Sequence, residues 1–220
     1  MSNFITHPVE KINQEEVVER SKKFYAWIKK RRTLRNFSKE NIPIEVMENI
    51  ILSAGTAPSG AHKQPWTFCL VSNPEMKKLI RLAAEEEEKT NYGGRMSEQW
   101  LKDLEPFETN ENKPFLEDAP YLIVVFKKMY ELNKDGERMP NYYVNESVGI
   151  ATGFLLAAIH NAGLVALTHT PSPMNFLART LKRPDNERAF LLIPVGYPPE
   201  NPKVPDLQRK ALNQVMIHYG

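Results

Sequence analysis

The chain has 220 residues, of which 41% are hydrophobic and 25% are charged, a composition typical of a globular protein. Its formal net charge of +2 gives no global field, so we expect no bulk attraction to nucleic acid or to a membrane. The single cysteine, Cys69, excludes an internal disulfide framework and a multi-cysteine zinc site. We therefore expect one domain over residues 1–220.

The first half of the chain predicts helices around one apolar run. Residues 1–30 are polar with scattered aromatic residues and predict a helical lead-in. A second helix is expected from Pro43 to a stop at Gly55. Asn73 and Pro74 are typical of the start of a third helix, whose apolar stripe ends at four glutamates. The following polar stretch, residues 89–117, is expected to be mobile helix and loop rather than core. In the apolar run, Cys69 is expected to be a buried structural thiol.

The second half combines buried strands and helices. The strongest strand signal is Tyr121–Phe126, and shorter strands are expected at residues 164–167 and 190–195. Residues 130–140 are expected to be a polar connection. Helices are expected at residues 144–160, where apolar residues lie on most faces, and at residues 176–181. The tail from Pro198 is rich in proline and extended. We expect a compact α+β fold with a C-terminal arm that packs on a second subunit.

A basic cluster, Arg31-Arg32-Thr33-Leu34-Arg35, places guanidinium groups and a hydroxyl within one short stretch. Arginine donates bidentately and stays charged, which suits a phosphate dianion. Taken alone, the cluster is more typical of a solvated basic helix end. A nucleic-acid patch is less favoured, because no aromatic interleaving or overall basicity accompanies it.

A second segment, Gly55–Trp66, combines small residues, hydroxyls and two prolines, which lets backbone amides approach a flat ligand. An ordinary loop between a helix and a strand is the alternative. The chain has no G-x-G-x-x-G or G-x-x-x-x-G-K-[ST] pattern, so neither a Rossmann dinucleotide site nor a P-loop is indicated. The histidines are widely separated, and we expect no metal site.

Together these two segments resemble the start of nitroreductase-fold flavoproteins. Further motifs are similar to the iodotyrosine deiodinase branch of that superfamily, in its order along the chain: Asn161-Ala162-Gly163-Leu164, Thr168-His169-Thr170-Pro171, Pro194-Val195-Gly196-Tyr197-Pro198 and Pro205-Asp206-Leu207-Gln208-Arg209-Lys210. The resemblance runs from about Arg31 to the end. It implies a central mixed β-sheet surrounded by helices, a C-terminal arm (residues 198–220) exchanged in a homodimer, and FMN in a site built from both subunits.

The resemblance also implies which residues bind FMN. One group would hold the phosphate and ribityl end: Arg31, Arg32, Thr33, Leu34, Arg35 and Arg209. A second group would lie against the flavin ring: Pro58, Ser59, Thr168, His169 and Thr170. Thr170 would present its hydroxyl to flavin N5 as a catalytic group. His169 stands where a hydroxyl residue is common in the family.

For the substrate, the resemblance points to Glu88, Tyr92 and Lys113, within an active-site lid over residues 85–117. A carboxylate and an ammonium match the two charges of an amino acid, and Tyr92 adds a hydroxyl four residues after Glu88. Ala61 would meet the substrate phenolate and act as the second catalytic position. From the residues alone, a solvated acidic face and a surface lysine would be favoured.

The implied activity is FMN-dependent reductive dehalogenation of halogenated tyrosines, with electrons from NAD(P)H or from a separate reductase. An NAD(P)H-dependent nitro or quinone reductase is the first alternative. A flavin- or tyrosine-binding protein without turnover is the second. Because the N-terminal segment has no long apolar stretch, we expect neither a signal peptide nor a membrane anchor, and a cytoplasmic location.

Overall fold

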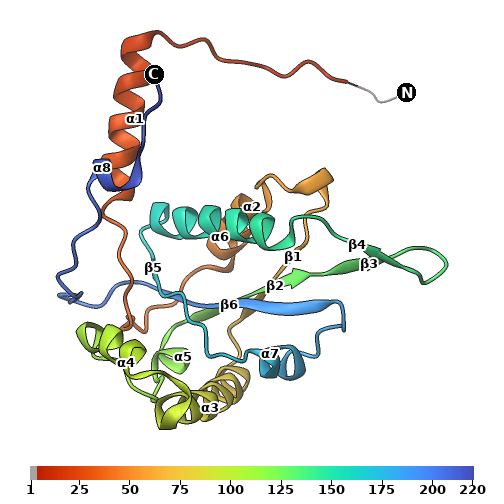
Figure 1. The fold of residues 1–220 in the computed structure, drawn as a ribbon, viewed down its shortest axis with the longest axis vertical. Helices are drawn as coiled ribbons and strands as arrows, with labels where there is room; N and C mark the ends of the chain where they lie inside the picture. Colours follow the sequence, from red (N-terminus) through yellow and green to blue (C-terminus); the bar gives the residue numbers. More distant parts are fainter. Residues whose placement is uncertain (1–3) are drawn as a thin grey trace. The chain divides into compact units, whose positions relative to one another are not determined.

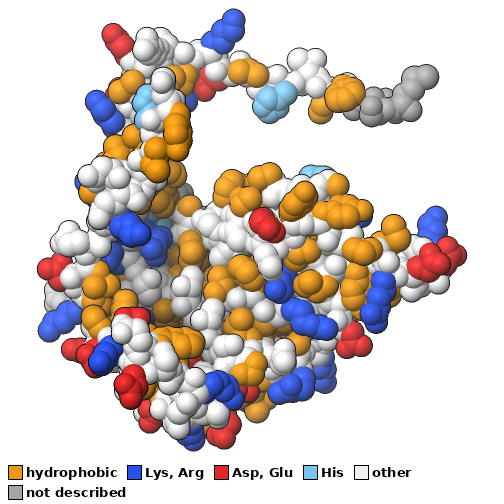
Figure 2. All heavy atoms as spheres, viewed as in Figure 1, with side chains coloured by type: hydrophobic (Ala, Val, Ile, Leu, Met, Phe, Trp, Pro, Cys, Tyr) orange, Lys and Arg blue, Asp and Glu red, His pale blue; other side chains and the backbone are white. Residues whose placement is uncertain are grey.

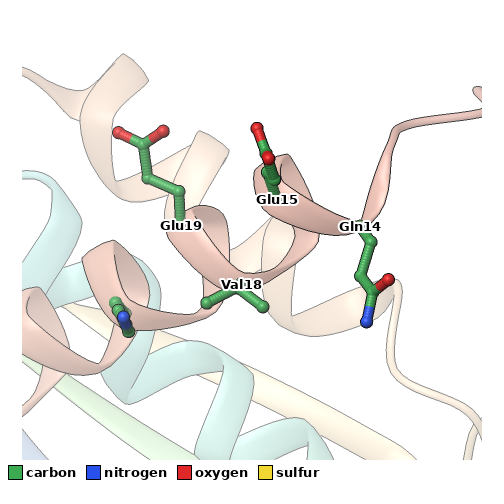
Figure 3. A pocket seen from close by; sticks show the side chains of 5 residues that line it. Gln14, Glu15, Val18 and Glu19 are labelled. Carbon is green, nitrogen blue, oxygen red and sulfur yellow. The ribbon is translucent and has the colours of Figure 1, made fainter.

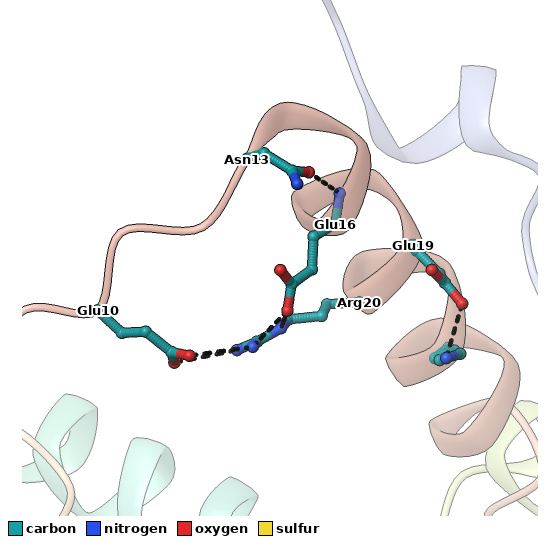
Figure 4. A network of polar contacts seen from close by, with 6 residues as sticks. Glu10, Asn13, Glu16, Glu19 and Arg20 are labelled. Carbon is teal, nitrogen blue, oxygen red and sulfur yellow. Dashed lines mark hydrogen bonds and ion pairs between the residues drawn. The ribbon is translucent and has the colours of Figure 1, made fainter.

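The computed structural model describes residues 4–220, and the chain divides between Arg31 and Arg32 into two compact units (Figure 1). The first unit contains helix α1 (Gln14–Ile28), which confirms a helical lead-in. Asn13 caps this helix by accepting a hydrogen bond from the Glu16 N–H at 2.8 Å, and Arg20 pairs with Glu10 and Glu16 (Figure 4). These pairs are exposed, so they contribute little to stability.

A shallow hollow runs along α1 (Figure 3). Its described lining comes from this one helix: Gln14, Glu15, Val18, Glu19 and Lys22. In Figure 3, Glu15 and Glu19 project to the same side of the helix, as residues four apart do. None of the sequence motifs falls on this surface, and we assign no function to it.

The second unit is built around a four-stranded sheet in the order β1-β2-β6-β5. Its strands are β1 (Trp66–Val71), β2 (Tyr121–Lys128), β5 (Val165–Ala166) and β6 (Glu187–Gly196). All three ladders are antiparallel. In the described residues, the parallel component of the expected mixed sheet is limited to a single bridge between Thr33 and Ala166. Cys69 in β1 is half-buried, and burial raises the pKa of its thiol, which keeps the thiol protonated.

Helices cover both faces of this sheet (Figure 1). Alternate residues of β2 point to opposite faces. Ile123 and Val125 belong to a core cluster with α2 (Ile44–Gly55) and α6 (Val144–Asn161). Leu122, Val124 and Phe126 belong to a second cluster with the helices of the other face: α3 (Pro74–Thr90), α5 (Phe115–Asp118) and α7 (Asn175–Thr180). A strand buried on both faces reads as a continuous apolar run, which explains the strong strand signal.

The capping signals are confirmed with small shifts. The Asn73 side chain accepts from the Met76 N–H at 2.8 Å, and α3 then runs through the glutamates to Thr90. Pro43 is the N-cap of α2 rather than its first residue, and Gly55 is the last residue of that helix. The remaining short helices are η1 (Gly60–His62), η2 (Asn91–Arg95), α4 (Glu98–Leu104) and η3 (Glu105–Phe107).

The polar connection expected at residues 130–140 contains a hairpin of β3 (Tyr130–Leu132) and β4 (Arg138–Pro140), which was not expected from the sequence. One expectation from the sequence was wrong. The stretch 89–117 is not wholly outside the core: Lys113, Phe115 and Leu116 are buried against α3 and the sheet. Local polarity does not reveal burial that a neighbouring helix creates.

The C-terminal arm is extended, as expected, apart from the short helix α8 (Leu212–Val215). Several of its apolar side chains are exposed, including Leu212, Ile217 and Tyr219. Figure 2 shows further hydrophobic side chains over the α6 region, where Ile150 and Phe154 are exposed. Exchange of the arm in a dimer stays a prediction. In residues 4–220, no helix combines the length and apolar character needed to cross a membrane.

Candidate active site

A cavity of about 140 Å³ in the second unit gathers the three predicted substrate residues and part of the predicted FMN site. It opens between α3, the segment that follows α3, and the residues after β5. Predicted site residues on its wall are Arg35, Glu88, Tyr92, Lys113, Thr168, His169 and Thr170. Residues that sequence reasoning did not assign complete the wall: Met96, Trp100, Leu104, Thr109, Phe115 and Leu167. The cavity wall therefore combines charged and hydroxyl-bearing side chains with apolar and aromatic ones, as small-molecule sites do.

Glu88 and Lys113 form a buried ion pair in this wall. Lys113 Nζ lies 3.3 Å from Glu88 Oε2, and the two side chains are only 4% and 7% exposed. The ammonium also donates to Thr109 Oγ1 at 3.4 Å and to the Asn110 carbonyl, and it lies 5.4 Å from the centre of the Tyr92 ring. From the residues alone, Glu88 would be predicted on a solvated acidic face and Lys113 on the surface. Both predictions are wrong, because the two side chains are buried.

Burial governs the proton affinities of the pair. It raises the pKa of the Glu88 carboxyl, which the Lys113 charge opposes, and it lowers the pKa of the Lys113 ammonium, which Glu88 opposes. Each charge is thus kept in the interior mainly by the other. Such a pair adds little stability, but separating it is costly unless new partners take over.

The segment Thr168-His169-Thr170 lies along the edge of the sheet. His169 exchanges two backbone hydrogen bonds with Leu192 of β6, at 2.8 and 3.0 Å. Side chains alternate along extended backbone, so Thr168 and Thr170 are exposed while His169 is buried. The His169 ring packs edge-on against Phe115, with centroids 5.5 Å apart. Burial, with the charges of Lys113 and Arg35, lowers the pKa of His169 to about 3. The threonine hydroxyls are therefore presented by a segment backed by a neutral imidazole.

His169 makes stability depend on pH. Because its pKa is about 3 in the folded chain, against 6.5 for an unperturbed histidine, its neutral form contributes stability above pH 6.5 that is lost as pH falls toward 3. At pH 5 the loss is about 2 kcal/mol relative to pH 7. We expect His169→Gln, which cannot titrate, to lose less stability than the unsubstituted protein over this interval, as measured by urea unfolding at both pH values. Equal losses in the two proteins would contradict the assignment.

The residues of the basic cluster have different surroundings, and Arg35 is the one that lines the described cavity. Arg35 lines the cavity, lies 5.5 Å from the Phe107 ring centre, and has its pKa lowered by burial. Arg32 donates through Nη2 to the carbonyl of Pro205 in the C-terminal arm. The Leu34 side chain is buried in the core and its N–H donates to the Ala166 carbonyl at 3.3 Å, so neither its side chain nor its N–H faces the cavity. Thr33 forms the parallel bridge described above.

Like Arg32, two further arginines of the predicted phosphate group, Arg31 and Arg209, lie outside the cavity wall that the structure describes. Arg31 is the last residue of the first unit. Arg209 lies in the exposed part of the C-terminal arm. Their roles toward a phosphate stay predictions.

The loop that contains Pro58, Ser59 and Ala61 does not line the described cavity. This loop packs on α6, where the Gly60 N–H donates to Ser147 Oγ at 3.4 Å, so it lies on the side of the sheet opposite to α3. Ser59 Oγ accepts from the Gln64 N–H at 2.9 Å. Ala61 is exposed and has a φ of 48°, an unusual value for a residue with a Cβ. Among the described residues, a single chain does not bring this loop to the cavity that holds Glu88.

Comparison with known proteins identifies the chain's relatives. Residues 28–197 match the family model for nitroreductases. The chain is 61% identical to an iodotyrosine deiodinase from Haliscomenobacter hydrossis, over 98% of this chain and 97% of that protein. It is 47% identical to iodotyrosine deiodinase 1 of Homo sapiens, over 93% of this chain and 71% of that protein. The chain belongs to the iodotyrosine deiodinase branch of the nitroreductase family.

A solved structure supports the same assignment for the fold. The crystal structure of an oxidized iodotyrosine deiodinase bound to FMN and 3-iodo-L-tyrosine matches with a TM-score of 0.77 and 32% identity, over 89% of this chain and 98% of that chain. A BluB-like flavoprotein from Clostridium difficile matches with a TM-score of 0.68 at 19% identity, which shows the fold alone. The α+β nitroreductase fold expected from the sequence is therefore confirmed for this chain.

Proposed function

We propose that the chain is an FMN-dependent oxidoreductase that removes halide from halogenated tyrosines and releases tyrosine. The observation that carries this proposal is the Glu88–Lys113 pair in the cavity wall, since a buried carboxylate and a buried ammonium match the two charges of an amino acid. Identity of 61% to an iodotyrosine deiodinase over nearly the full chain supports the same activity.

The residues present suit FMN. Arg35 on the cavity wall supplies a cation for a phosphate, and the exposed hydroxyls of Thr168 and Thr170 offer hydrogen bonds to a flavin edge. His169 Nε2 is buried and has no hydrogen-bond partner among the described residues, as expected beside a ligand site. FMN would supply the electrons that reduce the carbon–halogen bond. Arg31, Arg32, Thr33 and Arg209 are proposed to complete the phosphate site.

The chain's own residues bind, orient and shield the substrate. Glu88 takes the substrate ammonium and Lys113 takes its carboxylate, so that each buried charge exchanges one partner for another. Met96, Trp100 and Leu104 supply apolar surface over the aromatic ring and exclude water. In the overall reaction the carbon–halogen bond breaks, a carbon–hydrogen bond forms and halide leaves, which consumes an electron pair and one proton.

We also propose that two chains complete each site as a homodimer. Support comes from the loop of Pro58, Ser59 and Ala61, which the single chain holds across the sheet from Glu88. A second copy could supply this loop. The exposed apolar residues Ile150 and Phe154 of α6 offer a surface for such an association. The electron donor is proposed to be NAD(P)H or a separate reductase.

A titration tests the proposed function. The purified FMN-loaded protein is titrated with 3-iodotyrosine while flavin fluorescence is followed, then reduced with dithionite and assayed for iodide and tyrosine. We expect quenching at micromolar ligand and stoichiometric release of both products. If the FMN-loaded protein did not bind iodotyrosine but oxidised NAD(P)H in the presence of nitroaromatic compounds, it would instead be a nitro or quinone reductase. Tight binding without iodide release would indicate a binding protein.

A further inference from the structure

The four glutamates at the end of α3 do not share one environment. Glu85 and Glu88 are three residues apart and lie on the same side of the helix. Their side chains are 13% and 7% exposed, whereas that of Glu86 is 77% exposed. Glu88 faces the Lys113 ammonium, but the proposed function gives no role to Glu85.

Glu85 and Glu88 contact the same residue, Lys113. Glu85 accepts a hydrogen bond from its backbone N–H, and Glu88 pairs with its side-chain ammonium. Glu85 Oε1 accepts from the Lys113 N–H at 2.6 Å and from Arg81 Nε at 2.8 Å. Burial alone would raise the pKa of Glu85, but the hydrogen bonds from Lys113 and Arg81 outweigh it, so the pKa lies below its ordinary value. The carboxylate is therefore charged at neutral pH, and a charged acceptor makes a stronger hydrogen bond to an N–H than a neutral one.

The fold does not depend on Glu85 to attach this part of the chain to α3. Lys77 Nζ donates to the carbonyls of Glu117 and Ala119, both at 2.8 Å, and Arg81 pairs with Glu117 at 3.3 Å. The Leu116 side chain is fully buried beside them. These contacts attach residues 116–119, whereas Glu85 contacts Lys113, which precedes that stretch by three residues.

We propose that Glu85 is a positioning residue for the substrate: by holding the Lys113 N–H, it fixes the point from which the lysine side chain reaches the substrate carboxylate. This proposal rests on the proposed function, in which Lys113 takes that carboxylate. Without the contact, the lysine backbone can shift away from α3, and the ammonium loses its fixed distance from Glu88. A ligand that uses both charges of the pair is then affected more than a ligand that uses neither.

The test compares three variants of the FMN-loaded protein with two ligands. Glu85→Ala removes the acceptor, Glu85→Gln keeps an acceptor oxygen, and Glu86→Ala is the matched control for an exposed glutamate of the same run. The ligands are 3-iodotyrosine and 2-iodophenol, which lacks both amino-acid charges. For Glu85→Ala we expect about a tenfold loss of affinity for iodotyrosine and less than about a twofold loss for iodophenol, by flavin fluorescence quenching.

The other variants sharpen the result. Glu85→Gln should recover most of the lost affinity, and Glu86→Ala should leave the affinities for both ligands unchanged. Equal losses for the two ligands, or no loss for iodotyrosine, would overturn the role of Glu85 and leave the proposed function standing. If the unsubstituted protein did not bind iodotyrosine at all, the proposed function would fail as well.

Discussion

Replacing Lys113 with alanine is expected to lower the affinity for halotyrosine by at least about a hundredfold while FMN stays bound. The substrate carboxylate loses its partner, and Glu88 is left buried without one. Removing one member of a buried pair costs about 3–5 kcal/mol, because the remaining charge is uncompensated. Burial already raises the pKa of Glu88, and loss of the Lys113 charge removes the interaction that opposes this rise, which weakens the attraction of the carboxyl for the substrate ammonium.

Two titrations check this expectation. Flavin absorbance reports FMN occupancy, and flavin fluorescence quenching reports halotyrosine affinity. Lys102→Ala, an exposed lysine of α4, serves as the control for loss of one positive charge near the site. Glu88→Gln should show a loss similar to that of Lys113→Ala. Undiminished affinity in both variants would show that Glu88 and Lys113 do not bind the two charges of the substrate.

A ligand with only one of the two amino-acid charges is expected to bind more weakly than a ligand with neither. Iodotyramine offers an ammonium to Glu88 and leaves Lys113 without a charged partner. The corresponding iodophenyl propionate offers a carboxylate to Lys113 and leaves Glu88 without a charged partner. An uncharged iodophenol leaves the Glu88–Lys113 pair intact. Because leaving a buried charge unpaired costs several kcal/mol, we expect each half-charged ligand to bind about tenfold or more weakly than iodophenol.

The four ligands form a thermodynamic cycle. Iodotyrosine carries both an ammonium and a carboxylate. Iodotyramine carries the ammonium alone, the iodophenyl propionate carries the carboxylate alone, and iodophenol carries neither. We expect the coupling between the two ligand charges to favour binding by about 2 kcal/mol or more, well beyond additive behaviour. If each charge contributed the same free energy whether or not the other was present, the pair would not be exchanging partners with the ligand.

Much of the fold could be predicted because local signals agreed with burial. Asn73 caps α3 as its residue type predicts, and β2 is apolar on both faces because helices cover both. The hairpin at residues 130–140 was missed although its turn carries a signal. Asn133 Oδ1 accepts from the N–H groups of Asp135 and Glu137, and Gly136 has a φ of 80°. Asparagine and glycine so placed are typical of a tight turn.

The site was predictable only in part, because its residues come from separate segments. Arg35, Glu88, Lys113 and Thr170 line one cavity, but nothing in their spacing reveals that they meet, and the family resemblance alone indicated it. The resemblance could not show that the sheet separates Ala61 from these residues within one chain. Glu85 was missed because its partner is a backbone N–H, which leaves no mark on the identity of the contacted residue.

The stretch between α3 and Lys113 is attached at both ends, by the helix that it continues and by the contacts of Glu85 and Glu88 with Lys113. Between these attachments lie Met96, Trp100 and Leu104, the apolar part of the cavity wall that this stretch contributes. Replacing those three residues would alter the room over an aromatic ring while the charge pair and the sheet keep their own contacts. The preference for one aromatic amino acid substrate over another could therefore change in evolution, or be engineered, by replacing the single contiguous segment between α3 and Lys113.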